Sequence, residues 1–300
     1  MSDNPAPPSA LSQASWLSPV PLFFVVLWST GFIAAKYGLP YAPPLSFLFL
    51  RCLGAVLLLL PVVLLTHAPW PRGRIRHVAL AGLLLQAGYL GGVWSAIKIG
   101  MPAGLSALIV GMQPILTAFA APLVGERVTP RQWLGLLLGL SGVGLVVYAR
   151  LGLDGLAPGA VGLCVLALLS ITAGTLYQKR FCPRFDLRTG TVIQFCASAL
   201  VLLPLAVAFE DFTPALANIH WNVHFVGALL WSILALSIGA IFLLFRLISR
   251  NDATKVTSLL YLTPPTTAVM AWLMFGEALG PGGLLGMAVA VAGVAFVVKK

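Results

Sequence analysis

Charge is scarce in this sequence. Charged residues make up 9% of the 300 positions, whereas water-soluble domains carry about 25%. The deficit leaves no polar span long enough for a separate soluble domain, and 59% of the residues are hydrophobic. The mean hydropathy of +0.98 agrees with this composition. We therefore predict an integral membrane protein, and we assign the net charge of +10 to topology-setting loops rather than to nucleic-acid binding.

Side chains that carry chemistry inside a membrane are also missing. None of the eight acidic residues and none of the four histidines falls at the bilayer centre of the helices predicted below. Proton- and sodium-coupled carriers usually hold a carboxylate or an imidazole there, so we expect transport without ion coupling. An intramembrane hydrolase needs a buried nucleophile and base or a metal set, and no Walker motif is present. We expect no enzymatic activity, no metal and no cofactor.

Cysteine is rare and shows no C-x-x-C spacing. The four cysteines are Cys52, Cys164, Cys182 and Cys196. Most of them fall in apolar helices, where cysteine acts as a small core residue. We expect free thiols rather than disulfides or metal ligands.

Ten apolar runs follow an N-terminal tail. Residues 1–15 contain no basic residue, which a signal peptide requires, so we expect a disordered tail and a retained first helix. Each later run is long enough to cross about 30 Å of hydrocarbon. The predicted helices span residues 17–36, 45–66, 77–98, 102–123, 130–149, 158–179, 188–209, 224–246, 254–275 and 281–298. An even number of helices places both termini on one side of the membrane.

The basic residues indicate which side that is. Loops on the side of the termini hold 14 of the 18 lysines and arginines, and the opposite loops hold only Lys36, Lys98 and Arg150. The remaining one, Arg51, lies inside the second helix, where we expect it to reach the headgroups or a backbone carbonyl. By the positive-inside rule, the sequence predicts cytoplasmic termini in a bacterial inner membrane.

One stretch of the sequence occurs twice. Residues 103–147 and residues 254–298 align without a gap at an offset of 151 positions. The alignment matches Pro114 with Pro265, Gly125-Glu126 with Gly276-Glu277, Gly135 with Gly286, and Gly142 with Gly293. Such a set of matches at one offset indicates an internal repeat.

The repeat has a geometric consequence. Because each half contains five helices, an odd number, the second half enters the membrane upside down. We predict an all-α membrane fold of ten transmembrane helices in two inverted five-helix repeats, residues 16–150 and 151–300. Secondary transporters use this architecture for alternating access.

These features resemble the drug/metabolite transporter superfamily, in its EamA-type branch. Ten helices, a duplicated five-helix unit and a proline eleven residues before Gly-Glu in the fourth and ninth helices carry the resemblance, over residues 17–298. The segment 26–30 (VLWST) and the Tyr-x-Thr-Pro at 261–264 also resemble YddG-type exporters of aromatic amino acids. The resemblance implies export of amino acids through a central cavity. Residues 170–175 lack the aromatic side chains of that group, so a strict aromatic preference is not implied.

Polar and aromatic residues deep in several helices predict an amphipathic substrate pocket. The candidates are Trp28, Gln86, Tyr89, Trp94, Gln113, Tyr177, Trp231, Tyr261 and Thr263. Gln86 and Tyr89 are three residues apart and should share a helical face. Aromatic rings would stack on a substrate side chain, while amides and hydroxyls would bond its amino and carboxylate groups. The alternative for the aromatic residues is the belt at the membrane interface.

Prolines interrupt the fourth and ninth helices at matching depth. Pro114 and the pair Pro264-Pro265 each free backbone carbonyls, which in lipid must face protein or a wet cavity. We predict hinges at these positions; the alternative is a static kink packed by its neighbours. Lys36 and Lys179 end the first and sixth helices, and we predict a charge at each mouth of the cavity, with snorkelling to the headgroups as the alternative.

Two further groups have predicted structural roles. Glu126 and Glu277 should anchor loops by accepting hydrogen bonds from backbone amides. The glycines of the fifth and tenth helices, at three- and four-residue spacings, should allow close helix packing, either within one molecule or at a dimer contact. A monomer and a weak homodimer both remain open.

Together these features predict an inner-membrane exporter of amino acids and related metabolites that works by alternating access in the lipid bilayer. Export of nucleobases or cationic drugs is the alternative within transporters. A membrane sensor or assembly subunit that transports nothing is the alternative from another class. A wet pocket around Gln86, Tyr89, Gln113 and Tyr261 would favour the transporter, whereas a scaffold would bury these side chains in pairs.

Overall fold

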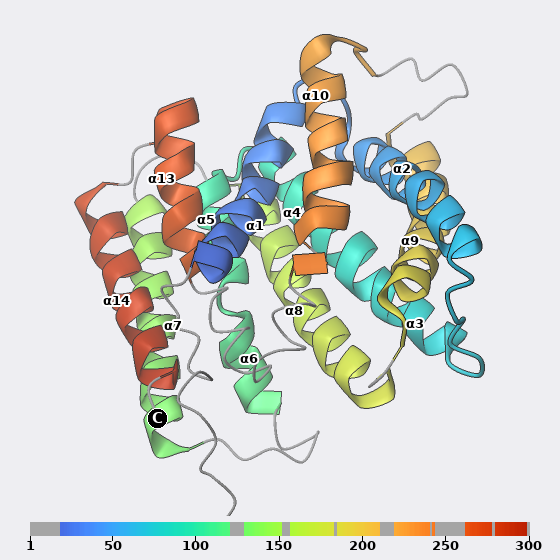
Figure 1. Cartoon of the computed structure of the whole chain (residues 1–300). Coiled ribbons are helices and arrows are strands. Elements are labelled where there is room, and N and C mark those ends of the chain that lie inside the picture. The colour runs from blue at the N-terminus through green and yellow to red at the C-terminus, as the bar shows by residue number, and fades with distance from the viewer. Residues whose placement is uncertain are drawn as a thin grey trace, which may run out of the picture.

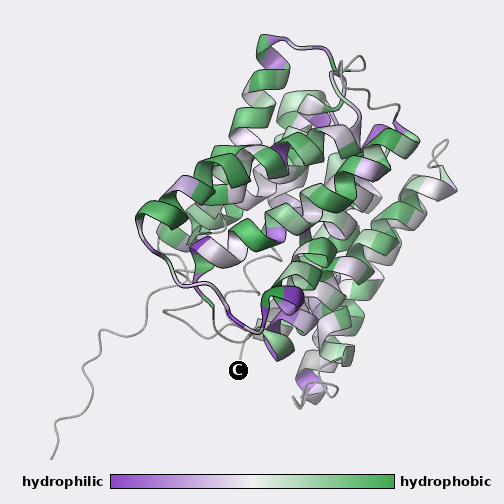
Figure 2. Ribbon diagram, turned by 90° about the vertical axis from the view of Figure 1, so that its right-hand side faces the viewer, coloured by the Kyte–Doolittle hydropathy of each residue, from purple (hydrophilic) through white to green (hydrophobic). Residues whose placement is uncertain are grey.

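The computed structural model describes residues 19–120, 129–151, 157–182, 185–210, 219–240, 242–243, 262–277 and 280–298. All regular secondary structure in these ranges is helical, and the helices form a bundle (Figure 1). Hydrophobic residues make up most of these helices (Figure 2), and many of them are exposed on the outside of the bundle; Leu65, Leu200 and Phe209 are 80%, 75% and 76% exposed. Side chains of this kind are solvated by lipid in a membrane protein. Seven of the described helices are long and apolar enough to span a bilayer, and the count of ten stays a prediction.

The first half contains two plain α-helices, one helix with a π-helical segment in its middle, one pair of short helices separated by a turn, and a final long helix. They are α1 (Pro19–Gly38), α2 (Pro44–Leu65), a continuous run of α3 (Ile75–Gly82), η2 (Leu83–Gly88) and α4 (Tyr89–Lys98), then α5 (Ala103–Val110), α6 (Gln113–Ala120) and α7 (Pro130–Leu151). The predicted fourth helix is thus two helices, separated by a turn at Gly111 and Met112. The predicted tail at 1–15 lies outside the described residues.

The second half repeats this order. It comprises α8 (Pro158–Phe181), α9 (Leu187–Phe209), α10 (Val223–Trp231) running into η4 (Ser232–Ala240), then α13 (Thr263–Phe275) and α14 (Pro281–Val298). The predicted ninth helix, 254–275, is described only from Leu262 onward.

Proline, glycine and polar caps determine several helix ends. α2, α7, α8 and α14 begin with a proline, which loses no helical hydrogen bond in the first turn. α13 ends at Gly276, whose φ of +65° is the left-handed conformation of a helix C-terminus. Asp186 caps α9 by accepting a 2.9 Å hydrogen bond from the backbone N–H of Arg188. The Arg188 guanidinium bonded to this carboxylate lowers the pKa of Asp186.

Corresponding helices of the two halves pack in the pattern of an inverted repeat. α2 packs on α9, α5 on α13 and α7 on α14, while α4 packs on α8 and α1 on α10. This exchange of partners is what a pseudo-two-fold axis in the membrane plane produces. At the α7–α14 contact, a Cβ on Gly293 would lie 2.5 Å from both the Gly135 carbonyl oxygen and the Gly139 nitrogen. The predicted close packing of these glycines therefore occurs within one molecule.

Both halves also contain a π-helical segment at the corresponding place, η2 in the third helix and η4 in the eighth. A π-helical turn replaces i→i+4 with i→i+5 bonding and leaves carbonyls that need other donors. In η2 the Leu84 carbonyl accepts a 2.8 Å hydrogen bond from the Ser170 hydroxyl of α8. In η4 the Ser232 carbonyl accepts a 2.9 Å bond from the Ser237 hydroxyl.

Candidate functional site

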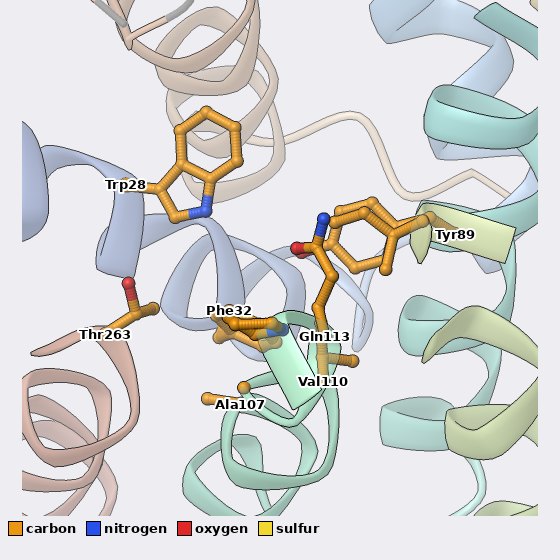
Figure 3. A pocket seen from close by; sticks show the side chains of 10 residues that line it. Trp28, Phe32, Tyr89, Ala107, Val110, Gln113 and Thr263 are labelled. Atoms are coloured by element: carbon orange, nitrogen blue, oxygen red, sulfur yellow. The ribbon is translucent and has the colours of Figure 1, made fainter. Parts of the chain in front are cut away.

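A pocket lies where the interrupted helices of the two halves meet (Figure 3). It is bordered by α1, α4, α5, α6, α8 and α13, and most of its surface is apolar or aromatic. Its lining residues are Trp28, Phe32, Tyr89, Ala107, Val110, Gly111, Gln113, Pro114, Ile171 and Thr263. Four of the nine predicted binding residues are among them: Trp28, Tyr89, Gln113 and Thr263. No Asp, Glu, Lys, Arg or His is in this set.

The predicted hinge prolines lie at this pocket. Pro114 is in its lining, one residue into α6, and Pro264 is one residue into α13. A Cβ added to Gly111 would lie 2.7 Å from Cγ of Pro264, so the turn between α5 and α6 contacts the start of α13. Pro265 follows in the first turn of α13. The backbone groups that these prolines free therefore have protein beside them, as a membrane requires.

The polar groups of the pocket differ in how they are satisfied. The Gln113 amide nitrogen donates a 3.0 Å hydrogen bond to the hydroxyl of Thr175 on α8, and its carbonyl oxygen remains an acceptor. Thr263 is 5% exposed, and its hydroxyl has no hydrogen-bond partner among the residues that the structure describes. In Figure 3 the Thr263 hydroxyl points toward the indole of Trp28, and the Gln113 amide lies beside the ring of Tyr89.

Apolar lining residues that the sequence analysis missed complete the pocket. Phe32 follows Trp28 by four residues on α1, so both lie on one helical face. Val110 follows Ala107 by three residues on α5 in the same way. This periodicity around Trp28 could have identified Phe32, but nothing local to Ile171 sets it apart from the other aliphatic residues of α8.

Four predicted binding residues lie away from the pocket lining. Trp94 is 1% exposed and packs against Phe47 with ring centroids 4.6 Å apart. Gln86 is buried within η2. The Tyr177 hydroxyl bonds to Nδ1 of His77 at 2.7 Å, near the end of α8.

Trp231 is 47% exposed, and its indole N–H donates to the Thr30 hydroxyl at 3.0 Å. Tyr261 lies outside the described residues, so its predicted role stays a prediction.

The two predicted cavity-mouth lysines are found at opposite ends of the bundle. Lys36, at the end of α1, forms an ion pair with Glu277, which directly follows α13. Its ammonium also lies 4.9 Å from the ring centroid of Phe275. Glu277 thus pairs with a lysine, and its predicted bonds to backbone amides stay a prediction. Lys179 lies exposed near the end of α8, and Glu126 falls outside the described residues.

Arg51 is buried rather than extended to the headgroups. It is 6% exposed, and its Nε donates a 2.8 Å hydrogen bond to the Ser237 hydroxyl in η4. A side-chain hydroxyl therefore takes the place of the backbone carbonyl that the sequence analysis expected. The Ser237 hydroxyl donates its hydrogen to the Ser232 carbonyl within η4, so its oxygen can accept the hydrogen bond from Arg51.

Within the part of the chain that the structure describes, no group of three or more His, Cys, Asp or Glu side chains could hold a metal ion. The pocket offers a ligand aromatic surface, one amide and two hydroxyl-bearing side chains. Such a lining suits recognition of a small amphipathic molecule.

Comparison with known proteins agrees with this architecture. The sequence pattern of the EamA-like transporter family matches residues 20–148 and again residues 159–299. A solved crystal structure superposes with a TM-score of 0.67 over 93% of this chain and 95% of the other, at 20% identity. At that identity the likeness is one of fold.

Relatives similar along almost their whole length are named as transporters. The chain is 28% identical to an uncharacterized inner membrane transporter, YedA, of Escherichia coli (strain K12), over 91% of this chain and 87% of that protein. It is 27% identical to a probable amino-acid metabolite efflux pump of Salmonella typhimurium, over 91% of both. It is 26% identical to a probable terminal-alkyne amino-acid exporter of Streptantibioticus cattleyicolor, over 97% and 95%. With both repeats matched, the chain belongs to the EamA-like transporter family.

Proposed function

We propose that this transporter exports amino acids, including large and aromatic ones, from the cytoplasm across the bacterial inner membrane. The observation that carries the proposal is the meeting of the two helix breaks at one amphipathic pocket. Gly111 of the first half and Pro264 of the second contact each other there. A site at the interface of inverted repeats is where secondary transporters bind their substrates.

The kinds of side chain that line the pocket suit recognition of a large amino acid better than recognition of a bare ion. Trp28, Phe32 and Tyr89 offer aromatic faces for a bulky side chain. The Gln113 carbonyl oxygen and the Thr263 hydroxyl offer an acceptor and a donor for polar groups. The names of two relatives, an amino-acid metabolite efflux pump and a terminal-alkyne amino-acid exporter, support the same substrate class.

The ion pair of Lys36 with Glu277 supplies a gate in this proposal. It joins α1 of the first half to the end of α13 in the second, at the end of the bundle that the positive-inside rule assigns to the periplasm. Closure there would leave the pocket to open toward the cytoplasm. By the symmetry of the repeat, Lys179 and Glu126 would close the opposite end when the halves exchange their tilts.

We further propose that transport is facilitated and runs down the substrate's own gradient. The lining residues of the pocket include no carboxylate and no imidazole, the groups that usually exchange a coupling proton. Substrate binding and release would then depend on the two orientations of the halves alone. A several-fold acceleration of flux by a pH gradient at clamped membrane potential would contradict this part of the proposal.

Uptake by purified protein in liposomes tests the function. Radiolabelled amino acids, offered one at a time without any ion gradient, should enter with saturable kinetics, large and aromatic ones among them. Uptake only under an ion gradient would keep the carrier and remove the facilitative mechanism. Uptake of nucleobases or cationic drugs in place of amino acids would replace the substrate class, and no uptake of any of them would contradict a transport function.

A further inference from the structure

The hydroxyl of Thr263 is a buried donor without a partner. Its residue is 5% exposed, and Oγ1 has no hydrogen bond among the described residues. Leaving such a group unpaired destabilises the folded protein. The neighbouring Thr266 avoids this cost by donating to the Leu262 carbonyl at 2.7 Å. Thr263 is the first residue of α13 and lines the pocket, where its hydroxyl points toward the indole of Trp28 (Figure 3).

The helix end around this hydroxyl favours an anion. The N-terminus of a helix carries unpaired N–H groups and roughly half a positive charge. α13 begins here with no side-chain cap. Pro264 and Pro265 have no N–H, so Thr263 alone supplies a backbone N–H among the first three helical positions. No acidic side chain lines the pocket to neutralise this end.

A second helix begins at the same pocket. α6 starts at Gln113, a lining residue, and is eight residues long. α6 and α13 run away from the pocket in opposite directions, because they belong to inverted halves. The C-terminus of α5 lies at the same pocket, at Val110 and Gly111, and opposes the positive end of α6. The start of α13 is therefore the end that favours an anion, as in broken transporter helices that bind anionic substrate groups.

We infer that the first turn of α13, with the hydroxyl and N–H of Thr263, binds the carboxylate group of the transported molecule. This inference rests on the proposed function and deepens it, because it names the part of an amino acid that is recognised and the place. The Thr263 hydroxyl donates to a carboxylate oxygen, while the Gln113 carbonyl oxygen accepts from the substrate's ammonium group. The substrate side chain then lies against Trp28 and Phe32.

Two valine variants on one helix provide the test. Thr263→Val removes the pocket hydroxyl and keeps the side-chain shape. Thr267→Val removes another buried hydroxyl without a partner one turn deeper, and Thr267 is not in the pocket lining. Each variant is reconstituted in liposomes, and uptake of phenylalanine is compared with uptake of phenylalaninamide, at a pH where both amines are protonated.

Wild type and Thr267→Val should prefer the acid over the amide, and Thr263→Val should lose this preference by about tenfold or more, as expected for one hydrogen bond to a charged group. Equal uptake of acid and amide by the wild type overturns the inference while leaving the transporter intact. An unchanged preference in Thr263→Val also overturns it. So does an equal loss in both variants, because that loss would not come from the pocket.

A binding measurement separates this inference from the proposed function. If no amino acid is transported, thermal stabilisation of the purified protein by phenylacetate is compared with stabilisation by phenylacetamide. Selective stabilisation by the acid in wild type and Thr267→Val, but not in Thr263→Val, supports the carboxylate subsite even though amino-acid export fails. Equal stabilisation by acid and amide overturns the subsite.

Discussion

The starts of α6 and α13 in this transporter are alike in backbone and different in their polar groups. The two helices belong to matching stretches of the inverted repeat, and each has a proline directly after its first residue. Yet Gln113, which begins α6, is held by Thr175 at 3.0 Å. Thr263, which begins α13, has a hydroxyl without a partner in the described part of the chain. The protein already bonds the amide at the start of α6, whereas the hydroxyl at the start of α13 is available to a ligand.

This difference separates two requirements of a carrier. In alternating access the two halves exchange their tilts in the membrane, which requires that their backbones be equivalent. The shared prolines, π-helical segments and helix pairings provide that equivalence. Binding a molecule with distinct ends needs side chains that are not equivalent. The following changes, from the largest expected effect to the smallest, test each side of the comparison.

Removing the shared breaks should have the largest effect. A proline inside a helix disfavours the continuous helix by about 3 kcal/mol, which is roughly 100-fold in an equilibrium. We expect Pro114→Ala combined with Pro264→Ala and Pro265→Ala to lower turnover in liposomes by roughly 10- to 100-fold, and Pro114→Ala alone to lower it less. The control replaces Pro61 and Pro204, which lie inside α2 and α9 on the exposed outside of the bundle. Normal turnover in the triple variant would show that the breaks are static kinks.

A single added methyl group can weaken the packing of α7 against α14. Gly293→Ala would place a methyl 2.5 Å from the backbone of Gly135 and Gly139, so α7 and α14 must separate. We expect the free energy of unfolding to fall by about 1–3 kcal/mol, measured as the thermal midpoint in detergent. Gly227→Ala in α10, where nothing lies within 4 Å of the added methyl, is the matched control. Equal midpoints for the two variants would contradict the close contact.

Gln113, whose amide is already bonded to Thr175, should affect the affinity for phenylalanine without affecting the preference for the acid over the amide. Gln113→Leu removes the hydrogen bond to Thr175 and the acceptor for the substrate's ammonium, so we expect the KM for phenylalanine to rise by about tenfold. The ratio of acid to amide uptake should stay near that of the wild type. If Gln113→Leu abolished that ratio and Thr263→Val did not, the assignment of the two ends would be reversed.

The ion pair at the end of α1 should give the smallest effect. Lys36 and Glu277 lie near the end of the bundle, with side chains 33% and 12% exposed, and such pairs contribute up to about 1 kcal/mol. We expect Lys36→Met and Glu277→Gln to change the uptake rate by a few-fold each and the double variant to match either single one. Additive effects in this double-mutant cycle would indicate that the pair does not act as one gate.

Sequence reasoning succeeded where the information is periodic or repeated. The inverted repeat matched Pro114 with Pro265, the second residue of the Pro264-Pro265 pair. In the structure Pro114 lines the pocket, and Pro264 lies against Gly111 beside it. Trp28, Tyr89, Gln113 and Thr263 were also predicted at the site and line it. The repeat offset placed Gln113 and Thr263 at matching depth, and Trp28 and Tyr89 were chosen as aromatic residues deep in their helices.

One physical reason explains why some predicted binding residues do not line the pocket. Depth along a helix does not give the direction in which a side chain points, and that direction depends on the helical turn. Gln86 lies in η2, where i→i+5 bonding changes the face expected from three-residue spacing. Trp94 shares the depth of the pocket but points to Phe47, and the Lys36–Glu277 pair joins residues 241 positions apart, which no local pattern encodes.

Access to the pocket from both sides of the membrane is the central claim, and one labelling measurement tests it directly. Val110→Cys is made in a chain whose four native cysteines, all unpaired, have been replaced, and sealed vesicles of both orientations are treated with a membrane-impermeant thiol reagent. Val93→Cys, buried in the core outside the pocket lining, serves as the control. We predict that Cys at position 110 is labelled from either side, that phenylalanine protects it, and that Cys at position 93 is not labelled. Labelling from one side only, or labelling that phenylalanine does not slow, would contradict the account.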